Sequence, residues 1–146
     1  MNETTVTTPN EIEIRVERVF DAPRAHVFSV WTDPELIPEW WGDQTVVEEL
    51  DVRPGGKWRF RLAHGTVEGE FREVDPPARL VQTFQNHLQT LEFEDLGERT
   101  KLTQTMRFAT TEERDTTMQY GVEEGAKGGF LRVDAVLRKL SGVTGS

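Results

Sequence analysis

The 146-residue chain contains no cysteine, so disulfide bonds, thiolate nucleophiles and cysteine-ligated metals are all excluded. It also lacks any apolar run of the roughly 18 or more residues that a membrane-spanning helix needs. Positive charge is scarce, because 17 Lys and Arg residues stand against 26 Asp and Glu residues, a formal net charge of -9. Nucleic-acid binding depends on clustered Lys and Arg that neutralise phosphates, so we expect no nucleic-acid partner.

The amino terminus, MNETTVTTPN, has neither the basic start nor the apolar core of a secretory signal. Together with the lack of cysteine, this favours a cytoplasmic protein that does not insert into membranes. A hydrophobic content of 36% and a charged content of 29% are typical of a globular protein, and the length fits one domain. We expect the polar residues 1–10 to be a disordered tail and residues 11–143 to form a single domain.

Residues 11–20 (EIEIRVERVF) alternate polar and apolar side chains, which predicts a strand with one buried face. Two short helices are expected in residues 21–32, with Asp21 as the N-cap, and in residues 33–41, where Pro38 keeps the helix short or kinked. Between residues 45 and 108, alternating runs are separated by turns at PGG, AHGT, DPP and LGER. Turns spaced about 8–12 residues apart indicate an antiparallel sheet.

The last long segment is predicted to be one helix that starts with a capping box of Thr110 and Glu113 and ends near Leu140. Each interior glycine costs a helix about 0.8–1 kcal/mol relative to alanine. This helix nonetheless carries four: Gly121, Gly125, Gly128 and Gly129. Its apolar stripe consists of Met118, Val122, Ala126, Phe130, Val133, Leu137 and Leu140. A curved sheet closed by such a helix leaves a central space for large side chains or a bound molecule.

Three segments of the chain resemble one protein superfamily: RVFDAPRAHVFSVWTDPELIPEWWG, DVRPGGKWRF and VEEGAKGGFLRVDAVL. The resemblance spans Ile12 to Leu140 and is to the START-like (SRPBCC) superfamily, in the bacterial branch related to the C-terminal domain of the heat-shock protein 90 ATPase activator. It implies an α+β helix-grip fold, as in birch-pollen-allergen-like proteins. In that fold a curved antiparallel sheet, two short helices and a long C-terminal helix enclose a cavity. Such cavities typically hold lipids, sterols, polyketides or other apolar molecules, and members include transfer proteins, cyclases and co-chaperone domains.

One departure from the family pattern lies in the last helix. Related bacterial proteins usually have Gly-Trp after two acidic residues, whereas here Glu123–Glu124–Gly125 is followed by Ala126. A tryptophan facing the sheet would fill much of the cavity, and alanine leaves that volume to other side chains, to a ligand, or empty. The glycines beside Ala126 then either preserve a hollow or simply allow close packing of helix on sheet.

Three polar side chains interrupt rows of apolar residues on the predicted strands. They are Gln104, between Leu102 and Met106; Gln82, between Leu80 and Phe84; and Glu48, between Val46 and Leu50. A few converging polar groups in an apolar lining are typical of small-molecule sites. The alternative is a bulge that turns these side chains to water. Trp40 and Trp41 either gate a cavity or anchor the short helix. The ligand-binding residues that we expect are Trp40, Trp41, Trp58, Phe60, Phe71, Gln82, Phe84, Gln104, Met106, Val122, Ala126 and Phe130.

No catalytic residue, metal site or cofactor is expected. The three histidines, His26, His64 and His87, lack metal-ligand spacing, and we expect them to be structural or exposed. The sequence has no G-x-S-x-G nucleophile elbow and no phosphate-binding loop. The favoured hypothesis is therefore binding of an apolar or aromatic small molecule, such as a lipid or polyketide, without covalent chemistry. Two alternatives stay open: a co-chaperone-like protein-interaction module, and a cyclase or hydrolase acting on a bound aromatic compound.

Overall fold

The computed structural model describes residues 3–42, 44–85 and 87–141. Its strands are β1 (Thr5–Asn10), β2 (Glu13–Phe20), β3 (Val46–Leu50), β4 (Lys57–Leu62), β5 (Gly65–Asp75), β6 (Arg79–Phe84), β7 (His87–Asp95) and β8 (Thr100–Arg107). Its helices are α1 (Arg24–Thr32), α2 (Ile37–Trp41), α3 (Thr111–Gln119) and α4 (Val122–Leu140).

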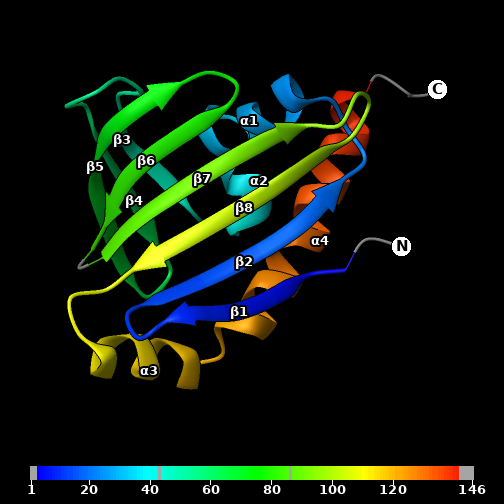
Figure 1. Ribbon diagram of the computed structural model, residues 1–146. Helices are drawn as coiled ribbons and strands as arrows, with labels where there is room; N and C mark the ends of the chain where they lie inside the picture. The colour runs from blue at the N-terminus through cyan, green and yellow to red at the C-terminus, as the bar shows by residue number, and fades with distance from the viewer. Residues whose placement is uncertain (1–2, 43, 86, 142–146) are drawn as a thin grey trace.

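These strands form one antiparallel sheet in the order β1-β2-β8-β7-β6-β5-β4-β3. The sheet curls around its long axis, and α1, α2 and α4 all lie behind it in the view of Figure 1. Helix α3 lies apart from them at one end of the sheet (Figure 1). The architecture confirms the predicted α+β class with a curved antiparallel sheet, two short helices and a long C-terminal helix. No helix in the described ranges has the length and apolar character needed to cross a bilayer.

The alternating pattern of β2 determines which side chains face the helices. Ile14, Val16 and Phe20 are at most 1% exposed, whereas the intervening positions remain partly accessible. Because side chains alternate between the two faces of a strand, this burial follows directly from the sequence pattern. The same inward row contains Arg18, whose burial the sequence analysis did not anticipate.

Arg18 forms an ion pair that joins β2 to α4. Its Nη1 and Nη2 atoms donate to the two carboxylate oxygens of Asp134 at 2.7 and 2.6 Å. The Arg18 side chain is 5% exposed and that of Asp134 is 23% exposed, so water screens this pair weakly. The guanidinium also lies 4.7 Å from the ring centre of Phe20, in cation–π geometry. The pair therefore ties the sheet to the second half of α4.

A close approach of β5 and β6 depends on Gly69. The indole Nε1 of Trp58 donates to the backbone oxygen of Thr83 at 3.1 Å. A Cβ atom at Gly69 would lie 1.9 Å from that oxygen and 2.6 Å from the indole nitrogen. Only glycine leaves room for this hydrogen bond, which fixes the ring of Trp58 against the sheet.

The expectation of a disordered tail is wrong for residues 5–10, which form the edge strand β1. This strand pairs with β2, with Val6 opposite Val16, and Val6 packs against the core. This pairing gives hydrogen-bond partners to the backbone groups along the outer edge of β2. The polar, threonine-rich sequence of residues 5–10 does not indicate such a strand. Residues 1–2 and the predicted domain end at residue 143 lie outside the described residues.

The predicted start of the first helix is also wrong. Helix α1 begins at Arg24 with Pro23 as its N-cap residue, and no side chain caps it. Asp21 instead accepts a hydrogen bond from Nε of Arg99 at 3.0 Å. Helix α2 is short, as predicted, and Pro38 lies in its first turn, where a missing N–H is tolerated.

The C-terminal segment contains two helices rather than one. The backbone N–H of Glu113 donates to the Thr110 hydroxyl at 3.1 Å, so the predicted N-cap is present at the start of α3. Gly121 then adopts φ of 86°, a left-handed conformation that glycine reaches without strain, and it separates α3 from α4. Gly121 is therefore an N-cap residue and does not weaken a helix interior.

We expect opposite effects from alanine at two glycines. Gly69→Ala should lower the free energy of unfolding by about 3 kcal/mol or more, because the added methyl group collides with backbone that the sheet holds in place. Gly128→Ala should raise it by about 0.8–1 kcal/mol, since its Cβ would meet only Arg132 Nη1, at 3.9 Å. Urea unfolding curves measure both. A loss below about 1 kcal/mol for Gly69→Ala would contradict the close approach.

Removing Asp134 should be costly because it leaves the buried Arg18 charge without a partner. We expect Asp134→Leu to cost about 3–5 kcal/mol, and the double variant Arg18→Met/Asp134→Leu to recover most of that loss. Glu68→Gln, which breaks the exposed Arg59–Glu68 pair, is the control and should cost about 0–1 kcal/mol. If the double variant is as unstable as Asp134→Leu alone, the loss of stability is not caused by an unpaired charge on Arg18.

Candidate functional site: a cavity between the sheet and the first half of α4

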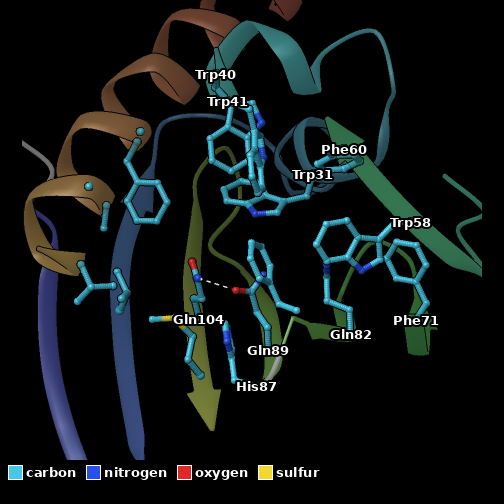
Figure 2. A pocket seen from close by; sticks show the side chains of 18 of the residues that line it. Trp31, Trp40, Trp41, Trp58, Phe60, Phe71, Gln82, His87, Gln89 and Gln104 are labelled. Carbon is cyan, nitrogen blue, oxygen red and sulfur yellow. Dashed lines mark hydrogen bonds between the residues drawn. The ribbon is translucent and has the colours of Figure 1, made fainter. Parts of the chain in front are cut away.

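A cavity of about 310 Å³ lies between the sheet and α4. All twelve residues that the sequence predicted for the site line this one cavity. Seven further lining residues were not predicted: Val16, Trp31, Leu50, His87, Gln89, Gly125 and Gly129. The inward faces of the strands and the helices α1, α2 and α4 thus bring together side chains that lie between Val16 and Phe130 in the sequence (Figure 2).

The cavity exists because α4 is buried along only part of its length. Phe130, Val133 and Leu137, in its second half, are at most 4% exposed and belong to the core. Val122 and Ala126, in its first half, are only partly buried. The apolar stripe predicted from the sequence is therefore packed at one end and borders a hollow at the other.

Aromatic side chains form most of the wall. The ring of Trp58 lies 5.0 Å from those of Phe60 and Phe84, and Trp41 stacks on Phe84 with an interplanar angle of 14°. Trp41 also meets Phe60 edge to face at 5.2 Å. These contacts carry Trp41 from α2 across to the sheet, so that its ring closes one side of the cavity (Figure 2).

Trp40 holds the short helix in place. Its indole Nε1 donates to the backbone oxygen of Val30 at 3.0 Å, and its own backbone oxygen accepts from Nε of Arg132 at 2.7 Å. A Cβ at Gly129 would lie 3.8 Å from the Trp40 ring, an ordinary van der Waals contact. One tryptophan of the pair therefore anchors α2 between α1 and α4, while the other encloses the cavity.

Gly125 marks the opening of the cavity. It lines the cavity and is also exposed to solvent. A Cβ placed on Gly125 would meet no atom within 4 Å. The first turns of α4 therefore border open space rather than the tight helix–sheet contact that glycines can also serve.

Three glutamines form a polar group on the sheet side of the cavity. Gln82 lies directly opposite Gln89 in the β6–β7 register, and Gln104 lies on the next strand. Nε2 of Gln104 donates to Oε1 of Gln89 at 3.0 Å (Figure 2). Gln82 is 8% exposed and lines the cavity. Gln89 is a polar residue in the apolar row of Leu91 and Phe93, just as Gln82 is a polar residue in an apolar row of β6. A polar residue in an apolar row was the signal that identified Gln82, and it could have identified Gln89 as well.

Glu48 does not belong to this polar group. The pairing of β3 with β4 shifts register between Val47 and Glu49, and Glu48 is exposed to solvent. Its carboxylate lies 3.6 Å from Nε of Arg61. The bulge considered in the sequence analysis thus turns this side chain away from the cavity.

His87 contributes a neutral imidazole to the lining. Its ring stacks on Phe84 with centroids 5.3 Å apart and lies 4.8 Å from Phe108. Burial disfavours the charged form and lowers the pKa of His87 to about 4. Among the described lining residues there is no Lys, Arg, Asp or Glu, so the cavity carries no formal charge at neutral pH. The described residues also contain no cluster of His, Asp and Glu that could hold a metal ion.

A long C-terminal helix held against a curved antiparallel sheet, with a cavity between them, defines a helix-grip protein of the START-like superfamily. The family model described as "Activator of Hsp90 ATPase homolog 1-like protein" matches residues 21–137. The chain belongs to this family, which confirms the resemblance seen in the sequence.

Solved structures share the fold. A protein from Rhodobacter sphaeroides superposes with a TM-score of 0.85 at 21% identity, covering 94% of this chain and 99% of that one. A protein from Mycobacterium smegmatis gives a TM-score of 0.84, also at 21% identity and with the same coverage. At this level of identity the likeness concerns the fold alone.

A curated relative is longer than this chain. An uncharacterised protein of Schizosaccharomyces pombe is 33% identical over 75 residues, which is 51% of this chain and 21% of that protein. The match therefore covers about a fifth of the length of that relative, and nothing about the activity of the longer protein transfers with it.

The lowered pKa of His87 predicts a pH-dependent stability. Between pH 6.5 and about 4 the unfolded chain binds a proton at this residue that the folded chain does not, so stability should fall as the pH falls through that window. His87→Gln should reduce this slope, and His64→Gln, at an exposed position, should leave it unchanged. Urea unfolding at several pH values measures the slope. Equal slopes for wild type and His87→Gln would contradict the lowered pKa.

Proposed function

We propose that the protein binds an apolar or aromatic small molecule in the cavity between the sheet and α4, without covalent chemistry. The observation that carries the proposal is an uncharged, aromatic-walled cavity whose lining contains a buried imidazole nitrogen, Nε2 of His87, without a hydrogen-bond partner in the described part of the chain. Ligand sites typically combine a mostly apolar lining with a few well-placed polar groups, in volumes of about 300–1,000 Å³. The cavity here, at about 310 Å³, lies at the lower end of that range.

The proposed ligand-binding residues are the twelve that the sequence predicted, together with Gln89 and His87. The aromatic rings supply apolar contact area, and the glutamines supply orientation. The superfamily suggests two classes of ligand, lipids and polyketide-like compounds. Access would be past Gly125, where the first turns of α4 are open.

A protein-interaction module is the second candidate, because the family description names an activator of the Hsp90 ATPase. An interaction surface needs a contiguous apolar patch of several hundred Å². The large apolar side chains exposed in the described residues are Val46 on β3, Leu96 between β7 and β8, Tyr120 between α3 and α4, and Leu131 on α4. Capture of a chaperone from a lysate, without any ligand in the cavity, would favour this candidate.

Catalysis on a bound aromatic compound is less well supported. His87 is the titratable side chain in the described lining, and its lowered pKa makes it a weak proton acceptor at neutral pH. Turnover of a bound compound would favour a cyclase or hydrolase over a simple receptor.

The direct test is native mass spectrometry of protein purified without denaturation, which should show a co-purifying small molecule. A ligand added at about 100 times its Kd should stabilise the fold by about 2.7 kcal/mol, a melting shift of several degrees for a chain of this size. Absence of any bound mass, and of any shift across an apolar compound library, would count against the receptor.

Filling the cavity should abolish binding. Ala126→Trp is expected to remove uptake of the neutral fluorescent probe N-phenyl-1-naphthylamine while changing the melting temperature little, because the indole enters empty space. Leu131→Trp, on the exposed face of α4, is the matched control and should bind the probe normally. Destabilisation by Ala126→Trp of about 1–3 kcal/mol, as in an overpacked core, would contradict the hollow.

A further inference from the structure

We infer that the ligand is an uncharged, planar ring compound that carries a hydrogen-bond donor beside an acceptor on one edge, such as a lactam, and that this edge pairs with the amide of Gln82. The inference rests on the proposed function and specifies the class of molecule that the same cavity takes.

The absence of charge in the described lining selects against ionic ligands. Burying an ionised carboxylate without a cationic partner is strongly unfavourable. No Lys or Arg lies among the described lining residues, and His87 is neutral near pH 7. A charged group placed at the glutamine side of the cavity would be left unpaired, so the part of the ligand that binds there is neutral.

The amide of Gln82 is a recognition group available to a ligand. Gln82 lines the cavity and is 8% exposed, so a ligand that enters the cavity can meet its amide. A primary amide presents an acceptor and a donor side by side. The complementary group is an edge with a donor next to an acceptor, and a lactam provides both in one plane.

Gln104 acts as a positioning residue for the neighbouring amide. Its hydrogen bond to Oε1 of Gln89 occupies that acceptor and leaves Nε2 of Gln89 as a free donor beside Gln82. The pair therefore offers an additional donor next to the Gln82 amide. A ligand carbonyl placed between the two strands could accept from both glutamines.

The surroundings of Gln82 favour a flat ring. Phe71 lies opposite Gln82 on β5, and Phe84 is its neighbour on the same face of β6. The ring of Phe84 stacks with those of Trp41 and His87, with interplanar angles of 14° and 19°. Aromatic rings prefer offset-stacked or edge-to-face partners, which a planar ligand supplies and a flexible acyl chain does not.

Three probes of similar size separate these requirements: 2-quinolone, a neutral bicyclic lactam; naphthalene, which has the same ring skeleton without polar atoms; and 2-naphthoate, which is charged at pH 7. Equilibrium dialysis of the full chain should give the tightest binding for 2-quinolone. Two added hydrogen bonds predict an affinity about tenfold above that of naphthalene. The charged probe should bind more weakly than either.

The matching variant is Gln82→Leu. It should reduce the affinity for 2-quinolone about tenfold, to the level of naphthalene, and leave the affinity for naphthalene unchanged. Binding of naphthalene by the variant shows that the cavity is intact. Gln119→Leu, at an exposed position of α3, is the control and should leave both affinities unchanged.

The inference is overturned if wild-type protein binds naphthalene or 2-naphthoate as tightly as 2-quinolone, or if a folded Gln82→Leu variant keeps the wild-type preference. Either result leaves the receptor proposal standing. If none of the three ring probes binds, and dodecanol does not bind either, the proposed function itself fails.

Discussion

The structure depends on a division along α4. From Gly129 onward the helix is held to the rest of the molecule: Phe130, Val133 and Leu137 are buried, and Asp134 is paired with Arg18 on β2. Before Gly129 it borders a hollow, where Gly125 and Ala126 present little side-chain volume. Since a straight helix contacts a curved sheet closely over only part of its length, packing at one end leaves room at the other. The cavity is therefore a product of the fold itself.

The inward faces of the strands could be predicted from the sequence because side-chain alternation has a period of two. Trp58 and Phe60 on β4, and Gln82 and Phe84 on β6, fall where the pattern places them. Pairing then brings these rows together in register, so residues predicted separately line one cavity. Gln89 and His87 on β7 carry the same signal and were missed, because one polar residue near a strand end looks like part of a turn.

Other features depend on contacts between distant segments and have no local signature. The ion pair of Arg18 with Asp134 joins residues 116 positions apart, and neither side chain alone identifies the other. Residues 5–10 become a strand because β2 offers an unpaired edge, not because of their own apolar content. The division of the last segment at Gly121 depends on one backbone angle, whereas the helical periodicity on both sides continues through it.

The two ends of the sheet, β1 and β3, are open edges in the described structure, and both are irregular. The pairing of β1 shifts between Thr7 and Asn10, next to Pro9, and that of β3 shifts between Val47 and Glu49. Bulges, proline and charged side chains at an edge hinder another chain from adding a strand. With a net charge of -9, such edges oppose self-association into extended β-structure. A curved sheet can thus keep a hollow, partly unfilled interior without becoming a template for aggregation.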